Sequence, residues 1–333
     1  MKRRLIAVLA AGICLAGCAP TTDQAGSEPT PTPTPKSESP SVRPITVQVA
    51  ALKGPTTMGL AWMMDHQDDD ASARFELSLH GSPDEITPGL VNGDVKLAAI
   101  PANLAAVLYA KGAKIKVAAV NTLGVLHVVT KNEAVTSLAD LAGKKIFSTG
   151  KGTTPQYVLD YLLAKSDVQA DVEYLAEASE VATRLAASDS AIAVLPEPYV
   201  TTVLAQDPSL VVALDLTAEW DKVSDTALVT GVLVVADDFL ERNPAAFNTF
   251  LEDYQASIEY TNANPDKAGP IIADLGIVPS PEVAAAAIPG SHLAFLSGRE
   301  CQAAVAAYLN VLFQANPQSI GNSLPDDGFY QGI

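Results

Sequence analysis

The strongest constraint on the fold is a short glycine turn that occurs twice in the chain. Residues 53–57 (KGPTT) and 151–155 (KGTTP) both place a lysine and a glycine before threonines at the start of a helical stretch, and their glycines, Gly54 and Gly152, are 98 positions apart. Glycine and proline are the strongest local markers of turns. The repetition predicts that the chain builds one kind of unit twice.

A second pair of matching segments supports this prediction. The apolar runs that begin at Leu97 and Ile192 end in Pro101 and Pro196, which are 95 positions apart, and each proline precedes a new helix. The order of turn and corner is the same in both copies. We therefore expect two half-sized lobes whose like elements face each other across a cleft.

Strand and helix patterns alternate from Ile45 to the end of the chain, beginning with a strand at 45–51. Further strands are expected at 96–100, 116–120, 126–130, 145–148, 191–195 and 231–235. Helices are expected at 57–65, 103–110, 155–165, 181–187, 244–262 and 300–314. With 333 residues, 48% of them hydrophobic, the chain buries a large core, and the alternation predicts an α/β fold with largely parallel sheets.

The N-terminus has the pattern of an export signal. Three basic residues precede an apolar run, and residues 15–18 (LAGC) resemble the cleavage site of a bacterial lipoprotein. We expect residues 1–17 to be a signal peptide and Cys18 to carry lipid, with a plain cleaved signal as the alternative. Residues 18–44 would then be a disordered linker rich in Pro, Thr and Ser.

Charge and cysteine content narrow the classes of partner. The formal net charge is −17, and no basic stripe could neutralise a phosphate backbone, so we expect no nucleic-acid partner. Cys14 leaves with the signal, so Cys301 would have no disulfide partner. We interpret it as a small buried residue of a helix spanning about 299–313.

The chemistry expected at the cleft is ligand binding. A glycine turn that enters a helix exposes unpaired N–H groups and the positive end of the helix dipole, and threonine hydroxyls and lysines can add polar contacts. The alternatives are plain helix capping by the threonines and a turn-forming role for the asparagines. The predicted ligand-binding residues are Lys53, Gly54, Pro55, Thr56, Thr57, Pro101, Asn103, Asn121, Thr122, Gly150, Gly152, Thr153, Thr154 and Glu197. No catalytic residue, metal site or cofactor is predicted.

Several stretches resemble the periplasmic-binding-protein-like substrate-binding proteins of nitrate, sulfonate, taurine and thiamine-precursor importers. They are 52–55 (LKGP), 93–103 (GDVKLAAIPAN), 137–146 (SLADLAGKKI), 195–199 (LPEPY) and the segments 239–240 (FL) and 243–244 (NP). The resemblance covers roughly 45 to 330. It implies an α/β, two-lobed type-II periplasmic-binding-protein fold with two hinge crossings and a ligand cleft. Lobe 1 would comprise 45–124 plus 232–333, and lobe 2 would comprise 125–231.

The same resemblance implies a function and its partners. It implies an extracytoplasmic solute-binding lipoprotein, anchored to the cell membrane by its N-terminal lipid, which delivers a small molecule to the permease and ATPase of an ABC importer. It implies no enzymatic activity, and nothing in the sequence demands more than a monomer.

Two classes of ligand are compatible with the sequence: an anion and a heteroaromatic molecule. Anion-binding relatives often bring an arginine to the cleft, whereas this chain has lysines at its glycine turns. Aromatic residues available to line a pocket for a ring are Tyr109, Phe147, Tyr157, Tyr199 and Trp220.

Two alternatives share the same fold. One is a ligand-sensing lipoprotein without a transporter, and the other is an enzyme of the thiamine-pyrimidine type, which uses its own histidine. We expect His66 in a solvated helix end, His80 at a strand end, His127 as a satisfied core group and His292 in a loop. No zinc-type spacing or nucleophile motif accompanies them.

Overall fold

The computed structural model describes residues 44–68 and 72–332. The chain divides into two compact units, Met1–Ser41 and Val42–Ile333, and the first lies outside the described residues. The predictions for the signal peptide, for Cys18 and for nearly all of the linker therefore also lie outside them. All that follows concerns the second unit.

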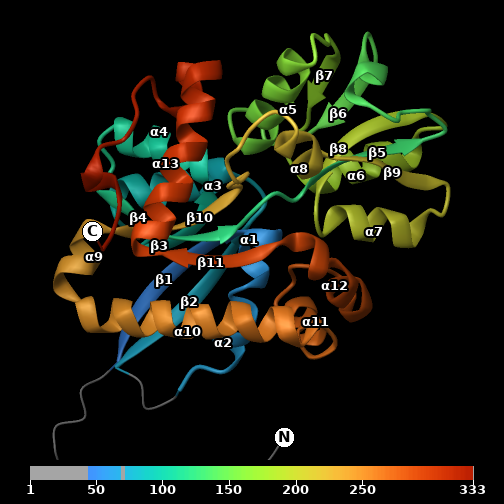
Figure 1. The fold of residues 1–333 in the computed structure, drawn as a ribbon. Coiled ribbons are helices and arrows are strands. Elements are labelled where there is room, and N and C mark those ends of the chain that lie inside the picture. The colour runs from blue at the N-terminus through green and yellow to red at the C-terminus, as the bar shows by residue number, and fades with distance from the viewer. Residues whose placement is uncertain (1–43, 69–71, 333) are drawn as a thin grey trace, which may run out of the picture. The chain divides into compact units, whose positions relative to one another are not determined.

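One sheet of six strands forms the core of the first lobe (Figure 1). Its order is β11-β4-β10-β3-β1-β2. The strands are β1 (Ile45–Leu52), β2 (Ala73–His80), β3 (Leu97–Pro101), β4 (Ile115–Thr122), β10 (Gly231–Ala236) and β11 (Leu293–Ser297). Successive side chains of a strand point to opposite faces, so Val49 packs in one core layer and Ala50 in the other.

A second sheet of five strands forms the second lobe, in the order β7-β6-β8-β5-β9. The strands are β5 (Leu126–Lys131), β6 (Lys145–Ser148), β7 (Asp171–Tyr174), β8 (Ala191–Pro196) and β9 (Leu210–Asp215). Because every strand of this sheet lies between residues 126 and 215, the second lobe is an insertion in the chain of the first.

The two sheets share one topology. In each, the strand before the glycine turn (β1 or β6) lies between its two parallel neighbours, and a strand arriving from the other lobe (β10 or β5) pairs antiparallel on both sides. The prediction of largely parallel sheets is therefore wrong: both sheets are mixed, because a strand that crosses from the other lobe enters its sheet from the opposite direction. The predicted repetition is a repetition of fold, and the two-lobed α/β class is confirmed.

Helices cover both faces of the first sheet. Helix α10 lies along one face with α2, and α4 and α13 lie on the other (Figure 1). The helices of the first lobe are α1 (Pro55–Met58), α2 (Ala61–Asp65), α3 (Pro83–Asn92), α4 (Ala102–Ala110), α9 (Asp237–Arg242), α10 (Pro244–Ala263), α11 (Pro265–Asp274), α12 (Pro281–Ala287) and α13 (Gly298–Ala315). Short 3-10 turns occur at η2 (Pro289–Ser291), η3 (Pro317–Ile320) and η4 (Asp327–Phe329).

The second lobe carries fewer helices. They are α5 (Thr154–Lys165), α6 (Ala178–Ala187), α7 (Tyr199–Gln206), α8 (Leu216–Asp221) and the 3-10 turn η1 (Leu138–Leu141). Within the described ranges, no helix combines the length and the apolar character needed to cross a membrane.

Two further predicted features differ from the structure. The single helix expected at 57–65 is two short helices, α1 and α2, with Gly59 and Leu60 between them. His127 was expected to be a satisfied core group, yet its buried Nδ1 has no hydrogen-bond partner. Cys301 is a buried free thiol on α13 as expected, and burial raises its pKa to about 12.

Candidate functional site

A cavity of about 110 Å³ lies between the lobes, where both glycine turns and both strand-to-proline corners converge. Seven of the predicted residues line it: Lys53, Gly54, Pro55, Thr56, Pro101, Gly150 and Thr153. Its other walls are Leu52, Gly81, Pro83, Val125, Leu126, Thr149, Pro155, Ala176, Ala178, Pro196, Tyr199 and Thr230. Residues from both lobes and both crossings thus enclose one space.

The first glycine turn forms an open part of the wall. Gly54 is buried, its φ of 162° is extended, and a Cβ built on it would meet nothing within 4 Å. The neighbouring Thr56 is 6% exposed, and its hydroxyl has no hydrogen-bond partner. The turn therefore offers the cavity both free volume and an unused polar group.

The second glycine turn is held by its own hydrogen bonds. Gly150 and Gly152 have φ values of 72° and 77°, the left-handed region that favours glycine. The Thr153 hydroxyl donates to the Gly150 carbonyl at 2.8 Å, and the Gly152 N–H donates to Oε1 of Gln156 at 2.8 Å. Gly152 itself is exposed and does not line the cavity.

Asn103 joins the lobes beside the cavity. Its buried amide, on α4, donates to the carbonyls of Gly152 at 3.2 Å and Ser319 at 3.0 Å. The Thr154 hydroxyl, on α5, donates to Oδ1 of Asn103 at 3.3 Å. Asn103, Gly152 and Thr154 thus form an interlobe clasp, and none of them lines the cavity.

Three further predicted residues also lie behind the cavity wall. The Thr57 hydroxyl donates to the Leu52 carbonyl, which leaves it in a local structural role. Asn121 and Thr122, at the end of β4, are 1% and 0% exposed. Buried polar side chains normally have partners, and the Thr122 hydroxyl has none, so the base of the cleft is unusually polar for its burial.

Glu197 occupies the second corner, after β8 and next to the crossing. It is 7% exposed and accepts hydrogen bonds from the Thr201 N–H at 3.1 Å and the Thr201 hydroxyl at 3.0 Å. Burial raises the pKa of its carboxyl, although His127 and His292 nearby act in the opposite direction. Its carboxylate is also near Gly290 of the first lobe, where a Cβ would be 3.1 Å from Oε1.

Among the five aromatic side chains expected near a pocket, Tyr199 lines the cavity. Trp220 is fully buried and packs against Tyr161 of the second lobe and Tyr308 of the first, and the Tyr109 hydroxyl donates to Asp326 at 2.6 Å. Sequence reasoning missed Thr230, Pro83 and the segment around Ala176. Thr230 directly precedes β10, and this position before a crossing strand is the one signal that could have identified it.

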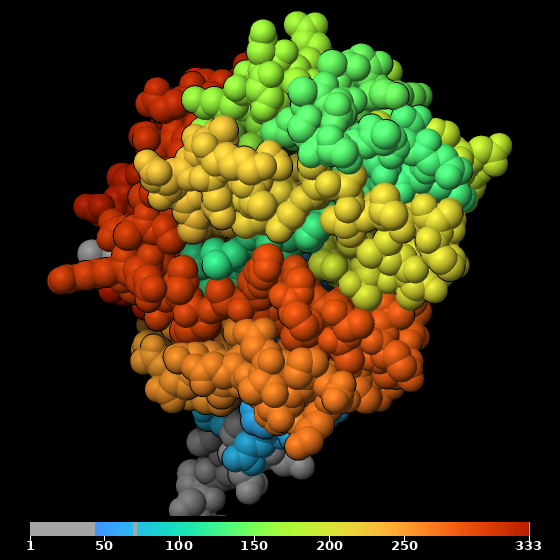
Figure 2. All heavy atoms as spheres, turned by 45° about the vertical axis from the view of Figure 1, so that its right-hand side comes forward, coloured from blue at the N-terminus to red at the C-terminus, as the bar shows by residue number. Residues whose placement is uncertain are grey.

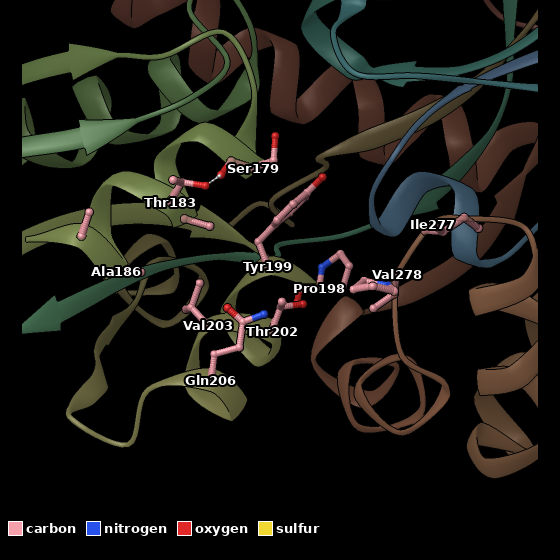
Figure 3. Close-up of a pocket in the computed structure, with 13 residues that line it drawn as sticks. Ser179, Thr183, Ala186, Pro198, Tyr199, Thr202, Val203, Gln206, Ile277 and Val278 are labelled. Atoms are coloured by element: carbon pink, nitrogen blue, oxygen red, sulfur yellow. Dashed lines mark hydrogen bonds between the residues drawn. The ribbon is translucent and has the colours of Figure 1, made fainter.

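A larger hollow of about 670 Å³ lies on the outside of the cleft. Residues of α6 and α7, among them Thr183 and Gln206, line one side, and Ile277 and Val278 of the first lobe line the other (Figure 3). Tyr199 contributes to both hollows. In Figure 2 the yellow surface of the second lobe meets the orange surface of the first along this side.

The described residues of the cleft provide neither a cluster of metal ligands nor a histidine in the cavity lining. In the described part of the chain, no group of three or more His, Cys, Asp or Glu side chains is placed to hold a metal ion. The residues that line the cavity include no histidine.

Comparisons with known proteins agree on the fold. A family model described as NMT1/THI5 like matches residues 76–268, more than half of the chain. A solved structure titled as an ABC transporter from Parabacteroides distasonis is 25% identical, covers 86% of this chain and 98% of its own, and has a TM-score of 0.71.

More distant structures share the same architecture. The alkanesulfonate-binding protein from Xanthomonas axonopodis pv. citri is 14% identical over 85% of this chain and 95% of its own, with a TM-score of 0.68. The periplasmic nitrate-binding protein from Synechocystis is 12% identical over 84% of each chain, with a TM-score of 0.65. No curated protein matches the chain.

Proposed function

Since the chain belongs to the NMT1/THI5-like family, we propose that it is the solute-binding component of an ABC-type importer. It captures a small molecule between its lobes and delivers it to a permease that is driven by an ATPase. The similar structure titled as an ABC transporter supports this role, because it covers nearly the whole folded part of the chain.

The observation that carries the proposal is the shared cavity. Its walls come from equivalent turns and corners of two lobes with one topology, and two segments, 123–125 and 222–230, connect those lobes. The crossings lie side by side, since the Thr230 N–H donates to the Thr122 carbonyl at 3.1 Å. Two lobes on a paired hinge can open to admit a ligand and close around it.

We propose lobe boundaries at 124/125 and 231/232; the first lies in the connection 123–125, and the second lies one residue inside β10. The ligand belongs to one of two classes, an anion or a heteroaromatic molecule. Structures with this fold are described as binding alkanesulfonate or nitrate, which supports the anionic class.

We propose that the mature protein is anchored at the outer side of the cell membrane by lipid on Cys18. The pattern at residues 15–18 and the proline-rich segment that follows support this proposal. A Pro-rich chain rises about 3.1 Å per residue, so this linker would hold the lobes well clear of the bilayer. A single lobe pair suffices for the function, so the protein acts as a monomer.

We propose that the protein is not an enzyme. A reaction of the histidine-consuming type requires a histidine at the ligand, and His66, His80, His127 and His292 do not line the cavity. A sensor without a transporter would use the same cleft, and only a test of uptake separates these roles.

Two measurements on the purified protein test the proposal. A ligand that binds only the native state at 100 times its Kd stabilises it by about 2.7 kcal/mol, and the radius of gyration should fall as the lobes close. Cells that lack the protein should then lose uptake of that ligand. Turnover of the ligand by the purified protein, or unchanged uptake, would contradict the importer role.

A further inference from the structure

We infer that the cleft selects a small uncharged molecule over an anion, with the unpaired hydroxyls of Thr56 and Thr230 binding its polar edge. This inference rests on the proposed function and narrows its ligand class. Three properties of the cavity carry it: the composition of its walls, the hydroxyls in its lining and the placement of charge around it.

The walls of the cavity carry few polar side chains, which are those of four threonines, Tyr199 and Lys53. Five of the lining residues are prolines, which have no N–H, and most of the others are glycine or aliphatic. The volume of about 110 Å³ is smaller than the roughly 150 Å³ of a protein cavity that holds one benzene molecule. A space of this size and lining limits the ligand to about one small ring.

Two hydroxyls in this lining have no hydrogen-bond partner. Thr56, on α1, is 6% exposed, and Thr230, on the returning crossing, is 9% exposed. An unpaired buried polar group costs roughly 1–3 kcal/mol, so both hydroxyls favour a ligand that satisfies them. A hydroxyl both donates and accepts, and it therefore suits an amide, a carbonyl or a ring nitrogen without requiring charge.

Charge around the cavity gives an anion little support. Lys53 is the one charged residue of the lining in the described chain, and it is exposed. Glu177 of the second lobe lies across the rim, where a Cβ on Gly81 would be 2.4 Å from its Oε1. A carboxylate beside Gly81, which is a lining residue, opposes the attraction that Lys53 could exert on an anion.

The helix start at the second turn is also weakened as an anion site. Pro155, the second residue of α5, has no N–H, and the N–H groups of Gly152 and Thr153 already donate to Gln156 and to the Gly150 carbonyl. An isolated anion transferred into such an apolar space loses its hydration without equivalent compensation.

The test uses one-ring compounds in matched pairs that differ in charge and little in shape. The pairs are benzamide with benzoate, nicotinamide with nicotinate, and benzenesulfonamide with benzenesulfonate. Binding of each to the purified protein is measured by calorimetry at concentrations up to about 10 mM, which detects affinities weaker than the 4.1 kcal/mol of a 1 mM Kd.

We expect the uncharged member of at least one pair to bind at least tenfold more tightly than its anion. Thr56→Val and Thr230→Val should each reduce that affinity at least fivefold. The matched control is Thr130→Val on β5, which removes another buried hydroxyl without a partner at a position outside the lining, and it should leave the affinity unchanged.

Other outcomes separate the inference from the proposed function. If the anions bind more tightly and Lys53→Ala weakens them at least fivefold, the inference is overturned and the binding role stands. If Thr56→Val, Thr230→Val and Thr130→Val all leave the affinity unchanged, the hydroxyls do not contact the ligand. If no member of any pair binds, both the inference and the proposed role of this cavity are contradicted.

Discussion

The two glycine turns are similar in sequence and occupy equivalent places in the two sheets, yet they differ in their hydrogen bonds and in the free volume beside them. The turn after β1 leaves open volume beside Gly54 and an unpaired hydroxyl on Thr56. The turn after β6 is closed by internal hydrogen bonds, and its Gly152 carbonyl accepts from Asn103 of the other lobe. Both copies line the cavity, and the second copy also bonds the other lobe.

Two turns at equivalent places in the fold can therefore have different local roles. Each turn joins a buried strand to a helix, so both are required by the topology. Their backbones differ, because Gly54 is extended whereas Gly150 and Gly152 are left-handed. A left-handed turn directs its carbonyls and N–H groups into its own hydrogen bonds and toward α4, and fewer polar groups remain for a ligand.

The largest expected effect is a loss of ligand affinity when the first glycine turn is altered. Gly54→Val places a branched side chain in the cavity, since a Cβ there meets nothing within 4 Å and the extended φ suits valine. We expect about a 100-fold loss of ligand affinity, equivalent to about 2.7 kcal/mol, with unfolding free energy changed by less than about 1 kcal/mol. Calorimetry with the best ligand and urea unfolding measure the two quantities. Full retention of affinity would place the ligand elsewhere.

The second effect concerns the clasp. Asn103→Ala removes an amide that bonds Gly152, Ser319 and Thr154, and it leaves buried groups unpaired. We expect about 2 kcal/mol less stability in urea unfolding. Small-angle scattering should also show a larger radius of gyration without ligand. Thr183→Val, whose exposed hydroxyl bonds only within α6, is the control with little expected change. An unaltered stability of Asn103→Ala would show that the clasp is not formed.

A smaller effect tests the second turn by stability. Gly152→Ala forces alanine into a φ of 77°, with no steric neighbour within 4 Å to add to the cost. The left-handed backbone alone should reduce the free energy of unfolding by about 1 kcal/mol. If Gly152→Ala instead weakened binding as strongly as Gly54→Val, with stability unchanged, the two turns would be equivalent and the comparison would fail.

The smallest expected effect is on the pH dependence of stability. It concerns Glu197, which follows Pro196 at the end of β8. Its pKa is raised by burial, so the native state binds a proton more tightly than the unfolded state does. The contribution of Glu197 to stability should therefore fall as pH rises above about 4.3, the ordinary pKa of glutamate, whereas Glu197→Gln removes this penalty. We expect the Tm of Glu197→Gln minus that of wild type to increase between pH 4 and pH 7.

The control for this pH dependence is Glu133→Gln, which should have the opposite sign. Hydrogen bonds from Ser190 and Lys144 lower the pKa of Glu133, so its contribution is present above the ordinary pKa and is lost as pH falls. A Tm difference for Glu197→Gln that stays constant with pH would mean that its carboxyl is not shifted.

Much of the fold could be predicted from the sequence because its signals are local. Apolar strands such as Leu97–Pro101 are buried on both faces and end in proline, and the glycine turns recur at a fixed spacing. The edge strands β2, β7, β9 and β11 were not anticipated, because they are shorter, more exposed or interrupted by charged residues. Their burial patterns carry less of the continuous apolar character that marks a central strand.

The site was harder to predict, because its composition depends on how the lobes meet. Lys53, Gly54 and Thr56 were found because they form a single turn at a strand end. Thr230 lines the cavity because it belongs to the returning crossing. Asn103 does not line the cavity, and its amide instead donates to the Gly152 carbonyl of the second lobe. These contacts join residues far apart in the chain, so neither local propensity nor spacing indicates them.

The most direct test of the account is a ligand screen run in parallel on wild-type protein and on Gly54→Val. A compound that binds in the interlobe cavity at 100 times its Kd should stabilise the wild type by about 2.7 kcal/mol and should leave Gly54→Val almost unshifted. A compound that stabilises both proteins equally would show that the ligand binds outside the cavity formed by the two turns.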